Sequence, residues 1–122
     1  LLLVCATATT HAQGEPVAQL QCEGTFIDYK QQPRLELTIP GVSVTVKHDI
    51  LMISGSAGFD GKYQVNLKHD SGLGFIAVNN QLYGGALNRF SGRLDLHAAK
   101  DSSRTSFNMI YTATCTKAKP LF

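Results

Sequence analysis

The sequence predicts an all-β fold, a small antiparallel β-barrel or sandwich of about eight strands. Apolar and polar residues alternate with a period of two along most of the chain, as they do in half-buried strands. Glycine-rich segments separate these runs, and no longer window shows a convincing helical period. At 122 residues, the chain has room for one hydrophobic core and one domain.

The first residues, LLLVCATATTHA, are an apolar run followed by small and threonine-rich residues ahead of Gln13. This composition is typical of the second half of a secretory signal, although an amphipathic N-terminal strand or helix is the alternative. We therefore expect residues 1–12 to be a truncated signal peptide and residues 13–122 to form a single β domain. No later segment approaches the about 18 apolar residues of a membrane span, so we expect a periplasmic or secreted protein.

Cysteine usage agrees with export. Cys5 lies within the expected signal, which leaves Cys22 and Cys115 in the mature chain. A single pair in an oxidising compartment predicts a disulfide. Cys22 is in phase with Leu20, and Cys115 is in phase with Tyr111, so both sulfurs should face the core. The bridge would then join the first and last strands of a closed barrel or sandwich.

The strands are expected in the following order. VAQLQCEGTFIDY opens the domain, and RLELTI and VSVTV alternate on either side of Pro40-Gly41. That dipeptide is either a two-residue hairpin loop, a wider loop or a kink within one strand, because Pro-Gly favours type II rather than primed turns. The remaining strands are predicted at residues 50–54, 63–67, 75–78 and 81–83, on both sides of Ser91-Gly92, and at 106–115.

An arginine shares the apolar face of the hairpin LNRFSGRLDL, which spans residues 87–96. If Ser91-Gly92 is a two-residue loop, Leu87 faces Leu96 and Arg89 faces Leu94. A buried, unpaired guanidinium is prohibitive, so Arg89 must pair, bond to carbonyl oxygens or rest its stem on the leucines with its head in water. A bulge that turns it outward is the other possibility.

This arginine also suggests a binding site. Arg89 and Arg93, together with the aromatic Tyr83, could hold an anionic ligand at a barrel mouth. The leading hypothesis is therefore an exported, non-enzymatic binding or interaction module of the cell envelope. Its partner would be a small ligand or an envelope protein, and we expect a monomer.

Composition and motifs do not favour catalysis or nucleic-acid binding. The formal charge is +2, and basic residues are scattered along the chain. There is no nucleophile elbow, P-loop or paired-carboxylate pattern, so we expect no enzymatic activity and no cofactor. The tripeptide KHD occurs at 47–49 and 68–70. Adjacent His and Asp on an extended chain point to opposite faces, so we expect no metal site unless His48 and His69 converge.

The chain resembles one group of proteins in its last third. LNRFSGRLDL followed by YTATCTKAKPLF is similar to the C-terminal half of small exported proteobacterial proteins of unknown function. That resemblance implies a compact β fold and carries no activity. The matching residues are Leu87, Asn88, Arg89, Ser91, Gly92, Leu94, Tyr111, Cys115 and the tail 117–122.

A second resemblance concerns SGSAGFDGKY, residues 54–63. With extra residues inserted, it resembles the Ser-Gly segment ending in Tyr of the MliC-type periplasmic lysozyme inhibitors, which are small disulfide-stapled β-barrels. The resemblance implies an alternative function, inhibition of lysozyme or another hydrolase. The loop entering the enzyme cleft would then comprise Ser54, Gly55, Ser56, Lys62 and Tyr63; the other interpretation is a glycine-rich loop without a partner.

Overall fold

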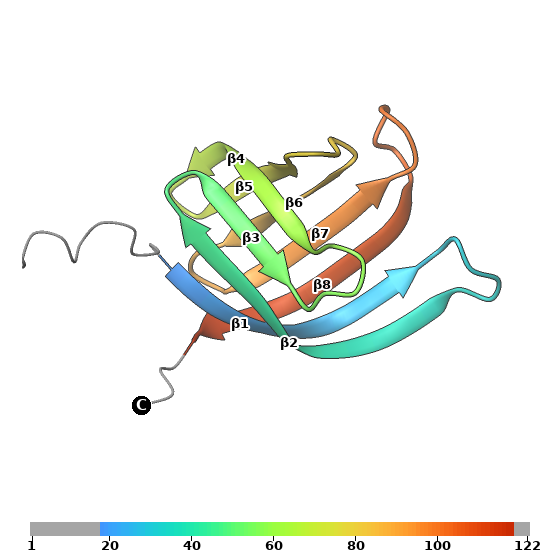
Figure 1. Ribbon diagram of the computed structural model, residues 1–122, viewed down its shortest axis with the longest axis horizontal. Coiled ribbons are helices and arrows are strands. Elements are labelled where there is room, and N and C mark those ends of the chain that lie inside the picture. Colours follow the sequence, from blue (N-terminus) through green and yellow to red (C-terminus); the bar gives the residue numbers. More distant parts are fainter. Residues whose placement is uncertain (1–17, 119–122) are drawn as a thin grey trace, which may run out of the picture.

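The chain forms a closed barrel of eight antiparallel strands, which confirms the predicted fold class (Figure 1). The computed structural model describes residues 18–118, so the expected signal peptide lies outside the described residues. Residues 18–118 contain no helix long and apolar enough to cross a membrane. The strands are β1 (Ala18–Asp28), β2 (Leu35–Lys47), β3 (Ile50–Ser54), β4 (Gly61–His69), β5 (Gly72–Ala77), β6 (Tyr83–Asn88), β7 (Arg93–Ala99) and β8 (Phe107–Lys117).

Each strand pairs with its neighbours in sequence, and β8 returns to pair with β1. Cys22 lies directly opposite Cys115 in this last ladder, and the two are joined by a disulfide. Both side chains are buried and belong to the core. The structure thus confirms the predicted bridge, which joins the first strand to the last across the seam that closes the barrel.

Pro40 and Gly41 lie within β2 and do not form a hairpin loop. Cys22 pairs with Val42 and Gly24 with Ile39, so β2 carries one residue more than β1 between these pairs. Gly41 adopts a φ of 78°, which a glycine tolerates without strain. The two-residue hairpin is therefore wrong and the kinked strand is confirmed, because a β-bulge accommodates both the positive φ and the missing proline N–H.

The β6–β7 hairpin has a wider loop than the sequence suggests. Leu87 pairs with Leu94, whereas the predicted register placed Leu96 opposite Leu87 and Arg89 opposite Leu94. The strands end at Asn88 and resume at Arg93, so that register is wrong.

Side-chain capping within the loop explains the difference. The Asn88 Oδ1 atom accepts hydrogen bonds from the backbone N–H groups of Phe90 and Ser91, at 2.9 and 3.0 Å. Gly92 has a φ of 75°, and its N–H donates to the Asn88 carbonyl oxygen. These bonds stabilise a four-residue loop, since Asn mimics a backbone turn and glycine supplies the positive φ.

The two ends of the barrel differ. At one end the β3–β4 loop, residues 55–60, inserts the fully buried ring of Phe59 into the interior. This ring lies 6.1 Å from that of Phe26 and 5.7 Å from that of Tyr83, both in edge-on contact. We call this the plugged end. The open end is the opposite one, where β1 begins and β2, β4, β6 and β8 end (Figure 1).

Removing the bridge tests how much the closed seam stabilises the fold. Cys22→Ser should lower the free energy of unfolding of the oxidised protein by about 4–5 kcal/mol, because a link across 93 positions restricts the unfolded chain. Denaturant melts measure this difference. Reductant should bring the wild-type protein to the stability of the variant and leave the variant unchanged; equal stability of variant and oxidised wild type would contradict the account.

Candidate functional site

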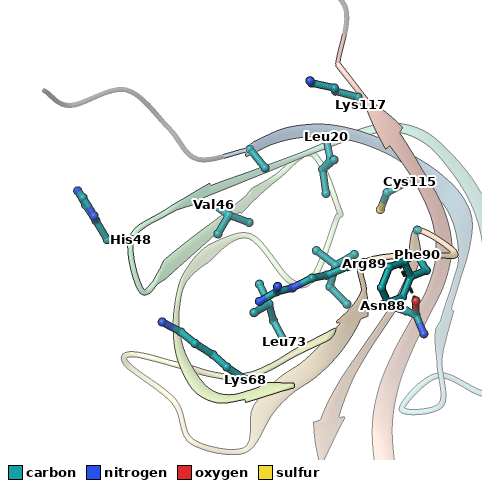
Figure 2. Close-up of a pocket in the computed structure, with 13 residues that line it drawn as sticks. Leu20, Val46, His48, Lys68, Leu73, Asn88, Arg89, Phe90, Cys115 and Lys117 are labelled. Atoms are coloured by element: carbon teal, nitrogen blue, oxygen red, sulfur yellow. Dashed lines mark hydrogen bonds between the residues drawn. The ribbon is translucent and has the colours of Figure 1, made fainter. Parts of the chain in front are cut away.

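A cavity of about 740 Å³ lies at the open end of the barrel (Figure 2). It is formed where the ends of six strands and the β2–β3 and β6–β7 loops meet. The lining residues are Ala18, Leu20, Val46, His48, Lys68, Leu73, Leu87, Asn88, Arg89, Phe90, Gly92, Cys115 and Lys117.

The deeper wall of the cavity is apolar. Leu20, Val46, Leu73 and Leu87 come from four different strands, and each occupies an inward position of its ladder. Two residues deeper into the barrel, Val44 of β2 and Phe75 of β5 are fully or almost fully buried in the core. The interior is therefore hollow toward the mouth and filled beyond that level.

The rim of the cavity is basic. His48, Lys68, Arg89 and Lys117 line it, and no aspartate or glutamate is among its described lining residues. Asp49, beside His48, forms an ion pair with the ammonium group of Lys68 at 2.5 Å. The hydrogen bond and the charge of Lys68 lower the pKa of the Asp49 carboxyl. The positive charge of Lys68 is thus largely offset by Asp49. Among the ion pairs within residues 18–118, none involves Arg89 or Lys117.

A bulge in β4 turns Lys68 toward the mouth. Val65 pairs with Phe75 and Leu67 with Gly74, so Asn66 is an extra residue in β4. Beyond it the alternation is reversed, and Leu67 is 53% exposed while Lys68 pairs with the inward-facing Leu73. Figure 2 shows the Lys68 side chain at the edge of the cavity.

Arg89 follows the end of β6 and remains in phase with Leu87, two residues earlier. Its backbone N–H donates to the Ser71 carbonyl oxygen at 2.8 Å, which ties the loop to the β4–β5 turn. The side chain extends over the mouth of the cavity above Leu73 (Figure 2), and the residue is exposed. Arg89 thus lies with its stem over apolar side chains and its head at the rim, in contact with water.

The structure does not bring Arg93 and Tyr83 to Arg89. Arg93 points outward from β7, and its Nε atom donates to both carboxylate oxygens of Asp95, at 3.0 and 3.2 Å. It borders a second, smaller hollow of about 310 Å³ along β4 to β7. Tyr83 begins β6 at the plugged end and packs against Phe59. Of the three residues proposed from the sequence, Arg89 alone lines the cavity at the open end.

Sequence reasoning missed two other cations at the rim. Lys117 lies opposite Leu20 at the end of β8 and is in phase with Cys115, a relation that the alternation of the last strand could have revealed. Lys68 could not have been found in this way, because the bulge at Asn66 reverses the alternation just before it.

The two histidines of the repeated KHD tripeptide line different hollows. His48 borders the cavity at the open end, whereas His69 borders the smaller hollow along β4 to β7. Within residues 18–118, no three His, Cys, Asp or Glu side chains are grouped so that they could hold a metal ion.

Residues 54–63, the segment that resembles the inhibitory loop, include the β3–β4 loop that fills the plugged end of the barrel, which we call the plug. Asp60 accepts hydrogen bonds from the Ser56 hydroxyl and from the N–H groups of Ser56 and Gly55, at 2.7, 2.8 and 3.1 Å. The Ser56 Oγ atom in turn accepts from the N–H of Phe59 at 3.0 Å. Tyr63 donates its hydroxyl proton to the Phe59 carbonyl oxygen at 2.7 Å.

Burial separates the five residues of that segment into two groups. Ser56 and Tyr63 are buried, and burial, followed by the charges of Tyr83 and Asp60, raises the pKa of the Tyr63 hydroxyl. Ser54, Gly55 and Lys62 are exposed. The serine and the tyrosine therefore hold Phe59 in the barrel and are not presented to a partner.

Comparisons with known proteins give no relative. No protein family, curated protein or solved structure matches the chain. The two resemblances drawn from short segments therefore stay predictions.

The Asp60 carboxylate should stabilise the plug in a pH-dependent way. Burial acts to raise its pKa, but the three hydrogen bonds from Ser56 and Gly55 hold that pKa below the ordinary value of 3.8. A carboxyl whose pKa is lower in the folded than in the unfolded protein stabilises the fold at neutral pH. This stabilisation is lost as the pH falls through the pKa of the folded state. Asp60→Asn should therefore lower the free energy of unfolding by about 1–3 kcal/mol near neutral pH and by much less in acid.

Urea melts at about pH 7 and about pH 2.5 measure both differences. Asp70→Asn is the matched control, because Asp70 is exposed in the β4–β5 turn. This control should match the wild type at both pH values. An Asp60→Asn variant as stable as the wild type at neutral pH would show that the carboxylate does not hold the plug.

Proposed function

We propose that the protein is an exported, non-enzymatic binding module of the cell envelope that holds a small molecule in the cavity at the open end. The observation that carries the proposal is the hollow mouth, whose deep wall is apolar and whose rim carries polar groups. Its volume of about 740 Å³ falls within the range of small-molecule sites. An eight-stranded barrel is also wide enough to hold one small ligand.

The cavity borders directly on the buried core. Leu73 and Leu87 belong to the core and are nearly buried, yet both also line the cavity. Apolar side chains beside a hollow lack the dispersion contacts that a close-packed interior supplies. An apolar ligand would restore those contacts, and this gain would favour binding.

Export is supported by the disulfide across the β1–β8 seam, since such bridges persist mainly in oxidising compartments. The apolar N-terminal run of the sequence agrees with this interpretation. We place the protein in the periplasm or outside the cell, as a monomer without a cofactor.

Inhibition of lysozyme receives no support from the geometry, because Ser56 and Tyr63 are used inside the barrel. We expect an excess of the protein to leave lysis by a c-type lysozyme unchanged. A lytic assay checks this, and dose-dependent protection of the cells would favour the inhibitor over the ligand-binding module.

Filling the cavity tests the proposal. The neutral fluorophore N-phenylnaphthylamine should bind the wild-type protein with increased emission. Leu20→Trp should weaken this binding about tenfold or more, because the larger side chain occupies the cavity. Gln19→Trp is the matched control, since Gln19 is the exposed neighbour on β1 and does not line the cavity.

Thermal melts establish that both tryptophan variants are folded, and Ala18→Trp fills the mouth from a second position on β1. We expect both cavity-lining variants to lose the fluorophore. If the fluorophore does not bind the wild type, or if it binds all three variants as well as the wild type, the cavity is not a binding site.

A further inference from the structure

We propose that the ligand is a single-chain amphiphile with one anionic head group, such as a medium-chain carboxylate. Its tail would lie inside the barrel mouth and its head against Arg89. This inference rests on the proposed function and specifies the chemistry of the ligand. The observation that supports this inference is that the cavity has an apolar interior and a basic rim.

The deep part of the cavity can accept only an apolar group. Its wall consists of Leu20, Val46, Leu73 and Leu87, none of which can donate or accept a hydrogen bond. A polar atom placed there would lose its water without gaining a partner, which is costly. The buried portion of the ligand is therefore a hydrocarbon chain, and any polar group must remain at the mouth.

The mouth favours an anion. The guanidinium of Arg89 lies over the opening (Figure 2), and its planar donors match the two oxygens of a carboxylate. Lys117 adds a second positive charge from the end of β8. No acidic side chain is among the described residues that line the cavity, so a cationic head group placed beside Arg89 would meet like charge.

The rim also favours a single charge over several. Lys68 pairs with the Asp49 carboxylate at 2.5 Å, and this negative charge offsets its own, so Lys68 attracts a ligand anion less strongly than Arg89 does. The Asp49 carboxylate would itself repel a head group that extends toward the β2–β3 turn. Arg89 is thus the principal contact, and a compact monoanion fits better than a polyanion.

A comparison of head groups on one tail tests this chemistry. Decanoate, decanol and decyltrimethylammonium would each be used to displace N-phenylnaphthylamine from the wild-type protein, below their micelle-forming concentrations. Decanoate should bind about tenfold more tightly than decanol, and the cationic compound should bind most weakly. Added salt should weaken the binding of decanoate alone, because exposed charges are screened.

Two arginines of the same hairpin provide the variant and its control. Arg89→Gln should weaken decanoate binding about tenfold and leave decanol binding unchanged. Arg93→Gln removes the same charge from the outer face, where Arg93 pairs with Asp95, and should change neither affinity. Arg89→Lys keeps the charge but loses the planar donors, so its affinity for decanoate should fall between those of the wild type and Arg89→Gln.

The head groups of an anionic membrane surface are the alternative partner for Arg89. Phe90, beside Arg89, is 82% exposed and would contact a bilayer docked on this face. Vesicles of phosphatidylglycerol would bind the wild type and not Arg89→Gln if this face docks on a bilayer. Such binding, together with no affinity for monomeric decanoate, would overturn the inference.

The remaining outcomes separate the inference from the proposed function. If decanol and decanoate bind equally and Arg89→Gln leaves their ratio unchanged, the cavity binds ligands but does not select anions. If neither compound binds and the fluorophore also fails, the proposed function itself is wrong. Preference for decanoate that is lost in Arg89→Gln and kept in Arg93→Gln is the result we expect.

Discussion

Pairing of β1 with β8 is the constraint on which the rest of the structure depends. It closes an eight-stranded meander into a barrel and so gives the sheet an inside. The disulfide between Cys22 and Cys115 lies in this ladder, at a pair that faces the core. Without this seam, β1 and β8 would be open edges, and the residues that line the cavity from β1 would not face those of β5 and β6 across the barrel.

The two ends of the closed barrel differ in how their interior is filled. One end is filled by its own loop, in which Asp60 and Ser56 hold Phe59 against Phe26 and Tyr83. At the other end, no loop within residues 18–118 fills the interior in this way, and these residues leave a cavity there. The plug supplies the packed core that the fold needs, and this leaves the mouth available for a ligand.

Local patterns predicted the features that depend on alternation and on cysteine pairing. Most of the strands, the inward phase of Cys22 and Cys115, and the placement of Arg89 on the same side as Leu87 follow from a period of two. The strand predicted at residues 81–83 is wrong, because β6 begins at Tyr83 and continues through the two glycines that follow it. Arg89 keeps this side although the hairpin register is different, because residues two apart share a face whatever strand lies opposite.

A period of two could not predict the features that arise where the inward–outward alternation of a strand is interrupted. The bulge at Asn66 turns Lys68 inward and Leu67 outward, and nothing in the local sequence marks its position. The Asn88 cap widens the β6–β7 loop, although glycine and serine suggested a tighter turn. Phe59 joins the core from a glycine-rich loop, where the expected role was either insertion into an enzyme or none. Each depends on contacts between distant strands.

The central claim is that the interior of the barrel accepts a ligand at the open end only. Methyl-labelled NMR during a titration with decanoate tests it most directly, because each methyl group reports on its own surroundings. We expect shifts at Leu20, Val46, Leu73 and Leu87, with none at the exposed Leu37. Shifts confined to Leu37 and other exposed methyl groups, or no shifts at all, would contradict it.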